Sequence, residues 1–256
     1  MMSSDGKLAI ISCEDAPKWG GPEGARRLCK MFKNQPDETW EYFMATEGEI
    51  PDSSKLEEYK GFVLTGSHYS ANDQHDWILR LEKFLKDVFE YQEAKKQCSP
   101  KLVGICFGHQ IMAKSLGAKV VKNNQGKFVF ELGQIDVDQG FKEKEYYQKV
   151  FKEDPSFSMF QSHSEEVKDL PSDVIQSVAR SDKCEHEILT YNKEGGLSFQ
   201  GHMEITSEEC LEKILPAIKN AGVYTTDQES EMKETLKKRE NQREQVVTLI
   251  KEYLEE

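Results

Sequence analysis

The sequence lacks the features that would place the protein at a membrane, outside the cell or on nucleic acid. No apolar run approaches the roughly 20 residues that a membrane-spanning helix needs. The first residues, Met-Met-Ser-Ser-Asp-Gly-Lys, do not follow the basic and then apolar order of a signal peptide. Positive charge is also scarce, with 34 basic against 46 acidic residues and a formal net charge of −12. We therefore expect a cytoplasmic protein that binds neither membranes nor nucleic acid.

The six cysteines are not arranged for disulfides or for zinc. They are scattered, without a CxxC pair, and the chain has no internal repeat. A chain of 256 residues is long enough to bury a large core without covalent cross-links, so reduced thiols are expected. Asp73, His75 and Asp76 crowd one loop, but we interpret them as solvated residues before a helix, because no third-position pattern supports a metal site. Neither a metal nor an organic cofactor is expected.

Over the first half of the chain, short apolar runs alternate with segments of helical periodicity. The strand-like runs cover residues 7–12, 39–44, 61–66 and 102–105, and the helical patterns cover residues 25–32, 77–91 and 107–116. Residues 17–24 are expected to form a loop rich in glycine and proline. This alternation predicts an α/β protein with a mostly parallel sheet and helices on both faces.

After Gly117 the pattern changes to short strand-like runs. They cover residues 118–121, 127–132, 134–137, 157–163, 174–179, 188–191 and 197–201, with a hairpin-turn signal at 192–196. These runs predict a small antiparallel extension of the sheet. A capping-box pattern, Thr206-Ser-Glu-Glu209, then predicts a helix to about residue 220, in which Pro216 favours a kink or an early end.

The last 32 residues, from Thr225 onwards, are mostly charged or amide residues with a narrow apolar stripe. The spacing predicts one long amphipathic helix or two shorter ones. Such a helix either packs on the body by its thin stripe and is otherwise solvated, or serves as a partner or dimer helix. The narrow stripe favours the first interpretation. We therefore divide the chain into a main domain over residues 1–222 and a charged C-terminal helical extension over residues 223–256.

The most informative stretch of the sequence runs from Lys101 to Gly117. Cys106 lies where the strand pattern ends and the helical pattern begins, between Gly104 and Gly108. Glycine tolerates the dihedral angles and close backbone approach that a sharp strand-to-helix turn requires. The thiol would then lie at the carboxyl end of a strand and over the positive end of a helix dipole, which favours the nucleophilic thiolate. A small buried cysteine in a turn is the alternative, but the paired glycines favour a nucleophile.

A cysteine nucleophile needs a base, and the base needs a group that orients it. His202 follows a strand-like run, and Glu204 lies two residues further on, where its carboxylate can fold back onto the imidazole. Both residues lie about one hundred positions after Cys106, a separation typical of groups that meet only in the folded protein. His109 is on the same expected helix as Cys106 and is interpreted as a packing residue.

These motifs resemble the class I glutamine amidotransferases. Gly104-Ile-Cys-Phe-Gly-His-Gln110 is similar to the family's nucleophile elbow, G-x-C-x-G-x-Q, and Phe199-Gln-Gly-His-Met-Glu204 to its closing Q-F/G-H-P-E segment. Gly61 to Ser67 is similar to the strand whose last glycine supplies an oxyanion-hole N–H. Phe160 to Pro171 resembles the segment S-H-x-D-x-V-x-x-L-P. The resemblance covers roughly residues 7–220 and implies a flavodoxin-like three-layer α/β sandwich.

The resemblance implies a role for each matching residue. Cys106 would be the nucleophile, His202 the general base and acid, and Glu204 the residue that orients His202. The backbone N–H groups of Gly66 and Phe107 would form the oxyanion hole. The residues expected to bind the γ-glutamyl head group are Gln110, Ser162 and His163.

Two positions depart from the family pattern. Met203 stands where the family usually has proline, which predicts a looser loop between the base and its carboxylate. Glu165 stands where the second motif usually has aspartate, so recognition of the head group is expected to differ there. Neither departure removes a member of the Cys-His-Glu triad.

The triad alone does not select the leaving group, because glutamine and γ-glutamyl peptides share the same acyl half. We expect a free-standing γ-glutamyl peptidase that cleaves glutathione or its conjugates, since the chain has no synthetase domain. One alternative is a glutaminase subunit that supplies ammonia to a separate synthetase, and a homodimer is also compatible with the sequence. A non-catalytic binding protein of the same fold is the third possibility, which the intact triad disfavours.

Overall fold

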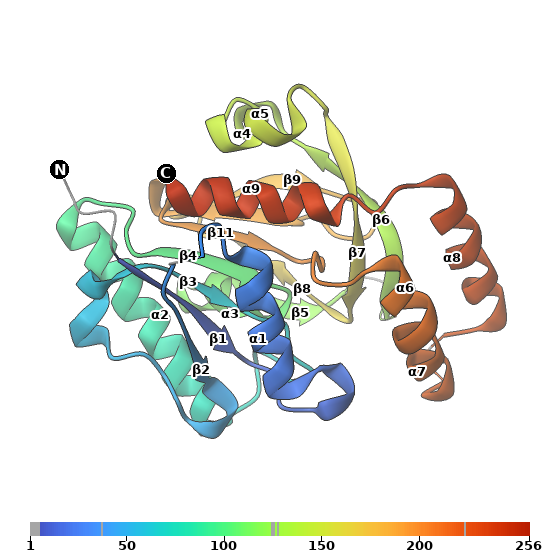
Figure 1. Cartoon of the computed structure of the whole chain (residues 1–256), viewed down its shortest axis with the longest axis horizontal. Helices are drawn as coiled ribbons and strands as arrows, with labels where there is room; N and C mark the ends of the chain where they lie inside the picture. The colour runs from blue at the N-terminus through green and yellow to red at the C-terminus, as the bar shows by residue number, and fades with distance from the viewer. Residues whose placement is uncertain (1–5, 37, 124–125, 127, 223) are drawn as a thin grey trace.

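The computed structural model describes residues 6–36, 38–123, 126, 128–222 and 224–256. In this part of the chain, nine strands form one curled sheet around which the helices are arranged (Figure 1). In spatial order the strands are β2 (Trp40–Met44), β1 (Lys7–Ser12), β3 (Tyr59–Leu64), β4 (Lys101–Ile105), β11 (Gly196–Phe199), β10 (Ile188–Tyr191), β9 (Ile175–Arg180), β6 (Val129–Val137) and β7 (Ser156–His163).

The sheet has a parallel half and an antiparallel half. The strands from β2 to β11 pair in parallel, and every pair from β11 onward to β7 is antiparallel. The predicted α/β fold is confirmed, but the antiparallel part is larger than the small extension expected, because β10, β9, β6 and β7 all join the main sheet. A separate two-stranded sheet pairs β5 (Lys119–Lys122) with β8 (Glu165–Lys168), a strand that the sequence pattern did not indicate.

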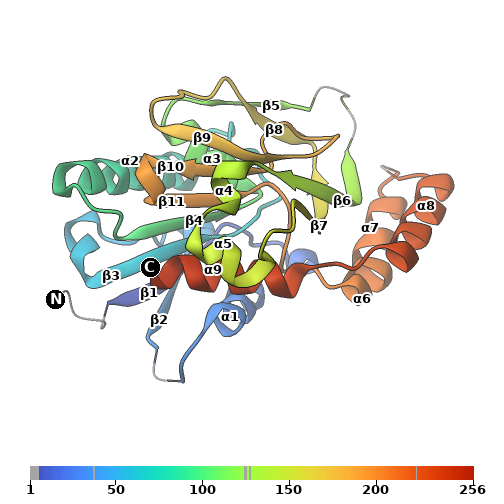
Figure 2. The same ribbon diagram turned by 90° about the horizontal axis from the view of Figure 1, so that it is seen from above.

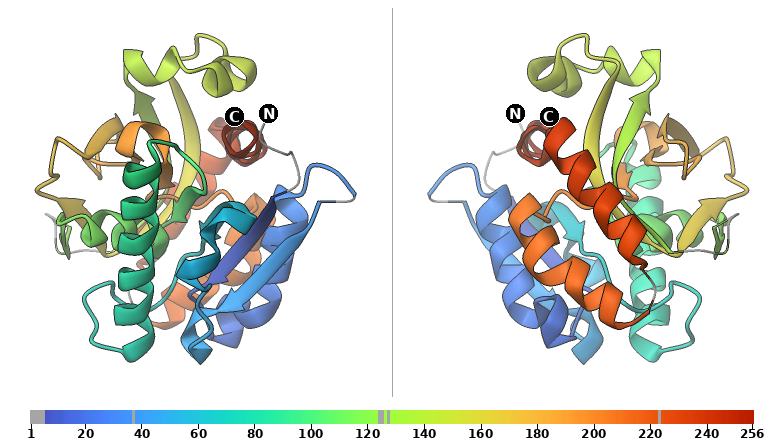
Figure 3. Two further views of the ribbon diagram at one scale, coloured as in Figure 1. Left: turned by 90° about the vertical axis from the view of Figure 1, so that its left-hand side faces the viewer. Right: turned by 90° about the vertical axis from the view of Figure 1, so that its right-hand side faces the viewer.

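Helices cover both faces of the parallel half, as Figures 2 and 3 show. One face packs against α2 (Asp76–Lys95) and α3 (Phe107–Ser115), and the other against α1 (Gly21–Phe32) and α9 (Arg243–Glu255). The short helices α4 (Gln139–Lys142) and α5 (Glu145–Phe151) connect β6 to β7, and α5 packs on α9. Successive residues of a strand point to opposite faces. Accordingly Ile10 of β1 belongs to the core under α1 and α9, and its neighbour Ile11 to the core under α2.

Several predicted boundaries differ from the structure. The expected loop over residues 17–24 is a short 3₁₀ helix, Pro17–Trp19, followed directly by α1, which begins at Gly21 instead of residue 25. Glycines in the first turn of α1 concealed its start, since they have low helix propensity. The two runs at 127–132 and 134–137 form the single strand β6, and residue 127 lies outside the described residues.

A helical segment lies beside the antiparallel half. It consists of α6 (Ser207–Glu209), a π-helical stretch over Cys210–Ile214, α7 (Leu215–Asn220) and α8 (Thr226–Lys238). The predicted capping box is present, because Thr206 Oγ1 accepts from Glu209 N–H and the Glu209 carboxylate accepts from Thr206 N–H. Pro216 has no N–H to donate to the preceding turn, and the helix takes the wider π geometry just before it.

The C-terminal residues form two helices, α8 and α9, and α9 is far more buried than its narrow stripe indicated. Six apolar side chains of α9 lie in the core on the α1 face, so the interpretation as a largely solvated helix is wrong for α9. The buried side chains are Val246, Val247, Leu249, Ile250, Tyr253 and Leu254. None of the described helices has the length and apolarity needed to cross a bilayer.

Candidate active site

Cys106 occupies a strained turn between β4 and α3. Its backbone has φ 51° and ψ −100°, an uncommon region for a residue with a side chain, and strain of this kind concentrates at functional sites. The flanking glycines allow the turn to pack tightly. A Cβ on Gly104 would lie 2.6 Å from the carbonyl carbon of Gly108, and one on Gly108 would lie 2.8 Å from Leu64 O. The two glycines therefore permit the backbone contacts that hold the thiol at the end of β4.

The thiol faces a pocket of about 700 Å³ at the carboxyl ends of the parallel strands. Cys106 is 7% exposed and lines this pocket together with Gly66 and His202. A Cβ on Gly66 would lie 3.2 Å from His202 Cε1 and 3.6 Å from Cys106 Cβ, so these three residues meet at one point. The pocket also reaches three partly buried apolar residues in other segments, which are Trp19, Phe128 and Ile214.

His202 is held between the two halves of the sheet. It follows β11, and its backbone N–H donates to Phe160 O of β7 at 2.7 Å. Its Nδ1 lies 2.6 Å from Glu204 Oε1, while Nε2 is buried without a hydrogen-bond partner among the described residues. The imidazole is thus oriented at one nitrogen and free to exchange a proton at the other, as a general base requires.

The electrostatics of this pair favour a charged imidazole. Burial alone would lower the pKa of His202, but the Glu204 carboxylate and Cys106 outweigh it and raise that pKa well above its ordinary value. Burial likewise opposes ionisation of Glu204, yet the contact with His202 lowers the pKa of Glu204 below its usual range. The two groups therefore stabilise each other as an ion pair.

Two other histidines near the site are unsuited to be the base. His109 is fully buried, its Nδ1 lies 2.8 Å from Ser198 Oγ, and burial lowers its pKa to about 3. This placement agrees with its interpretation as a packing residue. His163 has Nδ1 3.0 Å from Glu165 O, and burial lowers its pKa to about 4. Both imidazoles are neutral at pH 7.

Seven of the eight predicted site residues line the pocket, including the three expected to contact the head group. Gln110 donates from Nε2 to Glu165 O at 3.0 Å, and Ser162 presents its carbonyl 3.9 Å from Cys106 Sγ. The exception is Phe107, whose buried ring packs against Trp77 with a centroid distance of 5.6 Å. Its predicted contribution is a backbone N–H at the start of α3, which does not depend on the ring.

Two residues at the site were missed from the sequence, Glu14 and Gln200. Glu14 joins two loops, because its carboxylate accepts hydrogen bonds from the backbone N–H groups of Ala16 and His68 at 2.7 and 2.9 Å. Gln200 is fully buried, and its Nε2 lies 3.7 Å from Cys106 Sγ. Its position directly before Gly201 and His202 was the available signal, but only the fold brings it against Cys106.

A possible metal site is already engaged in hydrogen bonds. Among the described residues, Glu14, Asp15 and His68 form the one group close enough to hold a metal ion. His68 Nδ1 lies 2.8 Å from Glu14 Oε1, and Tyr69 OH donates to Asp15 at 3.3 Å. These contacts fix the loop after β3 that carries Gly66, so we assign the group to loop positioning.

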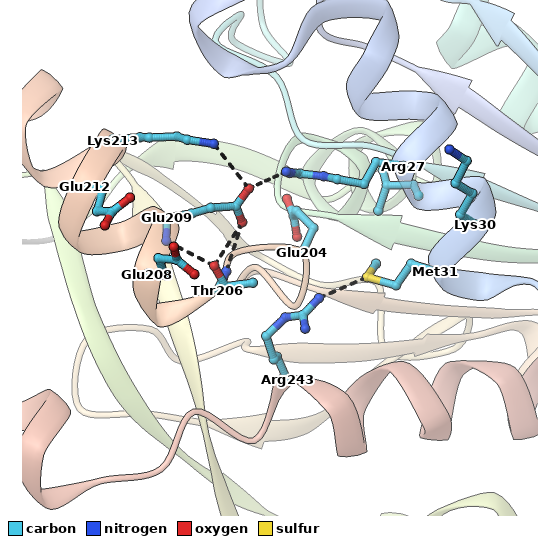
Figure 4. A pocket seen from close by; sticks show the side chains of 11 residues that line it. Arg27, Lys30, Met31, Glu204, Thr206, Glu208, Glu209, Glu212, Lys213 and Arg243 are labelled. Atoms are coloured by element: carbon cyan, nitrogen blue, oxygen red, sulfur yellow. Dashed lines mark hydrogen bonds and ion pairs between the residues drawn. The ribbon is translucent and has the colours of Figure 1, made fainter.

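A second cavity, of about 570 Å³, is lined by Glu204 on its other side from His202 (Figure 4). Glu204 faces it, and its Oε2 has no hydrogen-bond partner within the part of the chain that the structure describes. Arg27 of α1 forms an ion pair with Glu209, and both residues line this cavity as well as the active-site pocket. The ion pair therefore forms part of the boundary between the two spaces.

Comparisons with known proteins agree with the residue pattern. The family model for glutamine amidotransferase class-I matches residues 45–218. Gamma-glutamyl peptidase 2 from Arabidopsis thaliana is 32% identical over 218 residues, 85% of this chain and 82% of the relative. One component of the glutamine-hydrolyzing GMP synthase from Pyrococcus abyssi is 28% identical over 168 residues, 65% of this chain and 80% of the relative. A solved glutamine amidotransferase from Thermotoga maritima shares the fold, with a TM-score of 0.67 at 19% identity, covering 97% of this chain and 96% of that chain.

Proposed function

The chain belongs to the class I glutamine amidotransferase family and is a hydrolase of that type, and we propose that it is a γ-glutamyl peptidase acting on glutathione or its conjugates. The observation that carries this proposal is the strained Cys106 beside the His202–Glu204 pair in one pocket. A buried, oriented imidazole next to a thiol is the arrangement that thiol acyl transfer requires.

In the first half of the reaction, the Cys106 thiolate attacks the γ-glutamyl carbonyl carbon. A carbon–sulfur bond forms, and the carbonyl oxygen becomes an oxyanion held by the backbone N–H groups of Gly66 and Phe107. The carbon–nitrogen bond then breaks, and the leaving amine takes a proton from protonated His202. The raised pKa of His202 keeps this proton available at pH 7. The product of this half is a γ-glutamyl thioester.

In the second half, water hydrolyses the thioester. His202 Nε2 removes a proton from the water, the hydroxyl oxygen bonds to the carbonyl carbon, and the carbon–sulfur bond breaks to restore the thiolate. Glutamate leaves with the carboxylate formed. Glu204 stays ionised throughout and stabilises the imidazolium each time it forms.

The shape of the pocket supports a leaving group larger than ammonia. Beyond Cys106 the pocket extends to Trp19, Phe128 and Ile214, which offer apolar contact surface. A peptide such as Cys-Gly, with or without a substituent on sulfur, can use this surface, whereas ammonia cannot. The similarity to Arabidopsis thaliana γ-glutamyl peptidases supports the same choice.

A second candidate is a glutaminase subunit that supplies ammonia to a separate synthetase. The similarity to the GMP synthase component of Pyrococcus abyssi favours it. The two functions share the same thioester chemistry and differ in what leaves first. Such a protein would show weak glutaminase activity by itself, and a synthetase partner would raise it.

Hydrolysis of glutathione and of glutamine by the purified protein, compared side by side, tests the two candidates. Peptidase activity would release glutamate and Cys-Gly from glutathione, with little ammonia from glutamine. Ammonia from glutamine alone would favour the glutaminase subunit. If neither substrate is cleaved, an S-substituted glutathione is the last substrate to test, and no cleavage there would refute the peptidase.

Replacing the nucleophile provides the direct test of mechanism. Cys106→Ser is expected to lower turnover about 10³-fold or more, because a hydroxyl is a much weaker nucleophile than a thiol and gives up its proton far less readily. Cys98→Ser is the matched control, since Cys98 is half-buried and contacts Lys193 O at 3.3 Å, away from the pocket. Full activity in a folded Cys106→Ser variant would refute the mechanism.

A further inference from the structure

Gln200 contacts the nucleophile, yet the reaction described so far does not use it. Its side chain is completely buried, with Nε2 3.7 Å from Cys106 Sγ. Its own backbone N–H donates to Glu187 O at 2.9 Å, which fixes the main chain just before His202. With the main chain fixed and the side chain buried, the Gln200 side-chain amide has few orientations available. Whether its oxygen or its nitrogen faces the thiol is set by the second side chain that it contacts.

This second side chain is Gln110. The amides of Gln110 and Gln200 form a series of hydrogen bonds in which the donors and acceptors can be assigned in one way. Gln110 Nε2 lies 3.0 Å from Glu165 O and 3.2 Å from Gln200 Oε1. A backbone carbonyl only accepts hydrogen bonds, so Gln110 must present its NH₂ group on this side. Gln200 must then present oxygen to Gln110, which leaves its own NH₂ group facing Cys106. The carbonyl of Glu165 thus determines which atom meets the sulfur.

His202 lies beside Cys106 and interacts with its thiol. Two further contacts of the sulfur among the described residues favour opposite protonation states. Ser162 O, 3.9 Å from Sγ, accepts a hydrogen bond from the neutral thiol. The NH₂ group of Gln200 donates, and a donor stabilises an anion more than a neutral sulfur. Gln200 therefore favours the thiolate.

We propose that Gln200 is a thiolate-stabilising residue whose orientation Gln110 sets, so that the head-group site is coupled to the nucleophile through two side-chain amides. This inference rests on the proposed function, because it takes Cys106 as the nucleophile. Gln110 lines the pocket where the γ-glutamyl group is expected to bind. A substrate that contacts Gln110 thereby also affects the group that stabilises the attacking sulfur.

The test is the pH dependence of Cys106 alkylation by iodoacetamide, followed by mass spectrometry of the peptide that contains Cys106. Gln200→Glu keeps the shape of the side chain but replaces the donor with a carboxylate. We expect the pH of half-maximal alkylation to rise by about one unit and the rate at pH 7 to fall about tenfold. Gln200→Met, which removes the donor without adding charge, should shift the profile in the same direction by less.

Gln134→Glu is the charge-matched control, because Gln134 is exposed on β6, outside the pocket, and its new charge should leave the profile unchanged. If Gln200→Glu does not fold, Gln200→Met provides the same readout. An unshifted profile in a folded variant at position 200, even with a slower maximal rate, would overturn the proposal, since a purely structural role changes access and not ionisation. Alkylation needs no substrate, so its result can be interpreted even if the protein cleaves no γ-glutamyl compound. The absence of such cleavage would refute the proposed function, whereas an unshifted alkylation profile would refute the role of Gln200.

Discussion

At the scale of single residues, the site is built from groups that each hold another group in place. Glu204 orients His202, the Phe160 carbonyl fixes the backbone of His202, and Gln110 fixes the direction of Gln200. Such chains keep a few polar atoms free at the position where a substrate would bind. Among them are His202 Nε2 and His163 Nε2, which have no hydrogen-bond partner in the described part of the chain.

Neutralising Glu204, the carboxylate of the proposed triad, should change the pH profile as well as the rate. Glu204→Gln removes the charge that keeps the pKa of His202 high against burial, so the imidazolium is lost at a lower pH. In the proposed mechanism the imidazolium protonates the leaving amine, so its loss would limit the reaction on the alkaline side. We expect the alkaline limb of kcat/KM to move to lower pH and kcat to fall about 10- to 100-fold. An alkaline limb at the wild-type pH would show that Glu204 does not control His202.

The residues of the proposed triad were predicted from the sequence because each lies in a short, local motif, and the structure brings all three to one pocket. Cys106 lies between two glycines, and Glu204 lies two positions after His202. Gln200 and Glu14 could not be identified as site residues, since their partners are 94 and 54 positions away in the chain. Contacts across such separations depend on the order of strands in the sheet. That order cannot be predicted from a local sequence pattern.

At the scale of elements, the turn from β4 to α3 determines where the Cys106 thiol lies. Gly104 of β4 has β3 and β11 on either side, and its Cα faces the first turn of α3. The close approach of strand and helix needs a residue without a side chain at this position. The same approach brings Gly108 N–H within 3.2 Å of Thr65 O, beside the predicted oxyanion hole.

Adding one methyl group at this turn should be costly. In Gly104→Ala the new Cβ would lie 2.6 Å from Gly108 C and 2.7 Å from Met112 Sδ, so the helix must move away from the strand. We expect the free energy of unfolding to fall by about 1–3 kcal/mol, together with a loss of activity. Denaturant unfolding and turnover would measure both effects.

Gly140→Ala is the control for this substitution, because a Cβ there has its nearest neighbour at 3.7 Å. If Gly104→Ala is as stable and as active as the control, the turn is not as tightly packed as the structure indicates.

The sequence predicted the elements of the parallel half better than those of the antiparallel half. A strand buried on both faces, such as β4, is a short apolar run with clear ends. The edge segments after Gly117 have mixed composition, and β6 was predicted as two strands because a glycine interrupts its pattern. Pairing partners, which decide where such strands end, lie far away in the chain.

At the scale of the whole molecule, α9 joins the C-terminal residues to the main core. It packs beside α1 and α5 on one face of the sheet. At its end, the buried Lys101 donates from Nζ to Tyr253 O at 2.5 Å, which ties the helix to the first residue of β4. The many charged residues of α9 did not indicate this role. The sheet face that α9 covers exists only in the assembled fold and cannot be seen in the sequence of the helix.

Shortening one buried side chain of α9 tests this dependence. Leu249→Ala removes a fully buried side chain and should lower the free energy of unfolding by about 2–5 kcal/mol. Thr248→Ala, at an exposed position of the same helix, should change it by less than about 0.5 kcal/mol. Thermal unfolding of the two variants measures the difference, and equal stabilities would mean that α9 is not part of the core.

The division of the pocket between segments has a consequence for how this protein can diverge. The proposed catalytic groups follow the ends of β3, β4 and β11, whereas Trp19, Phe128 and Ile214 come from three other segments. Mutations in those segments can alter which leaving group is accepted while the acyl chemistry is inherited intact. After a gene duplication, one copy could therefore acquire a new substrate by changes in the pocket's outer wall alone.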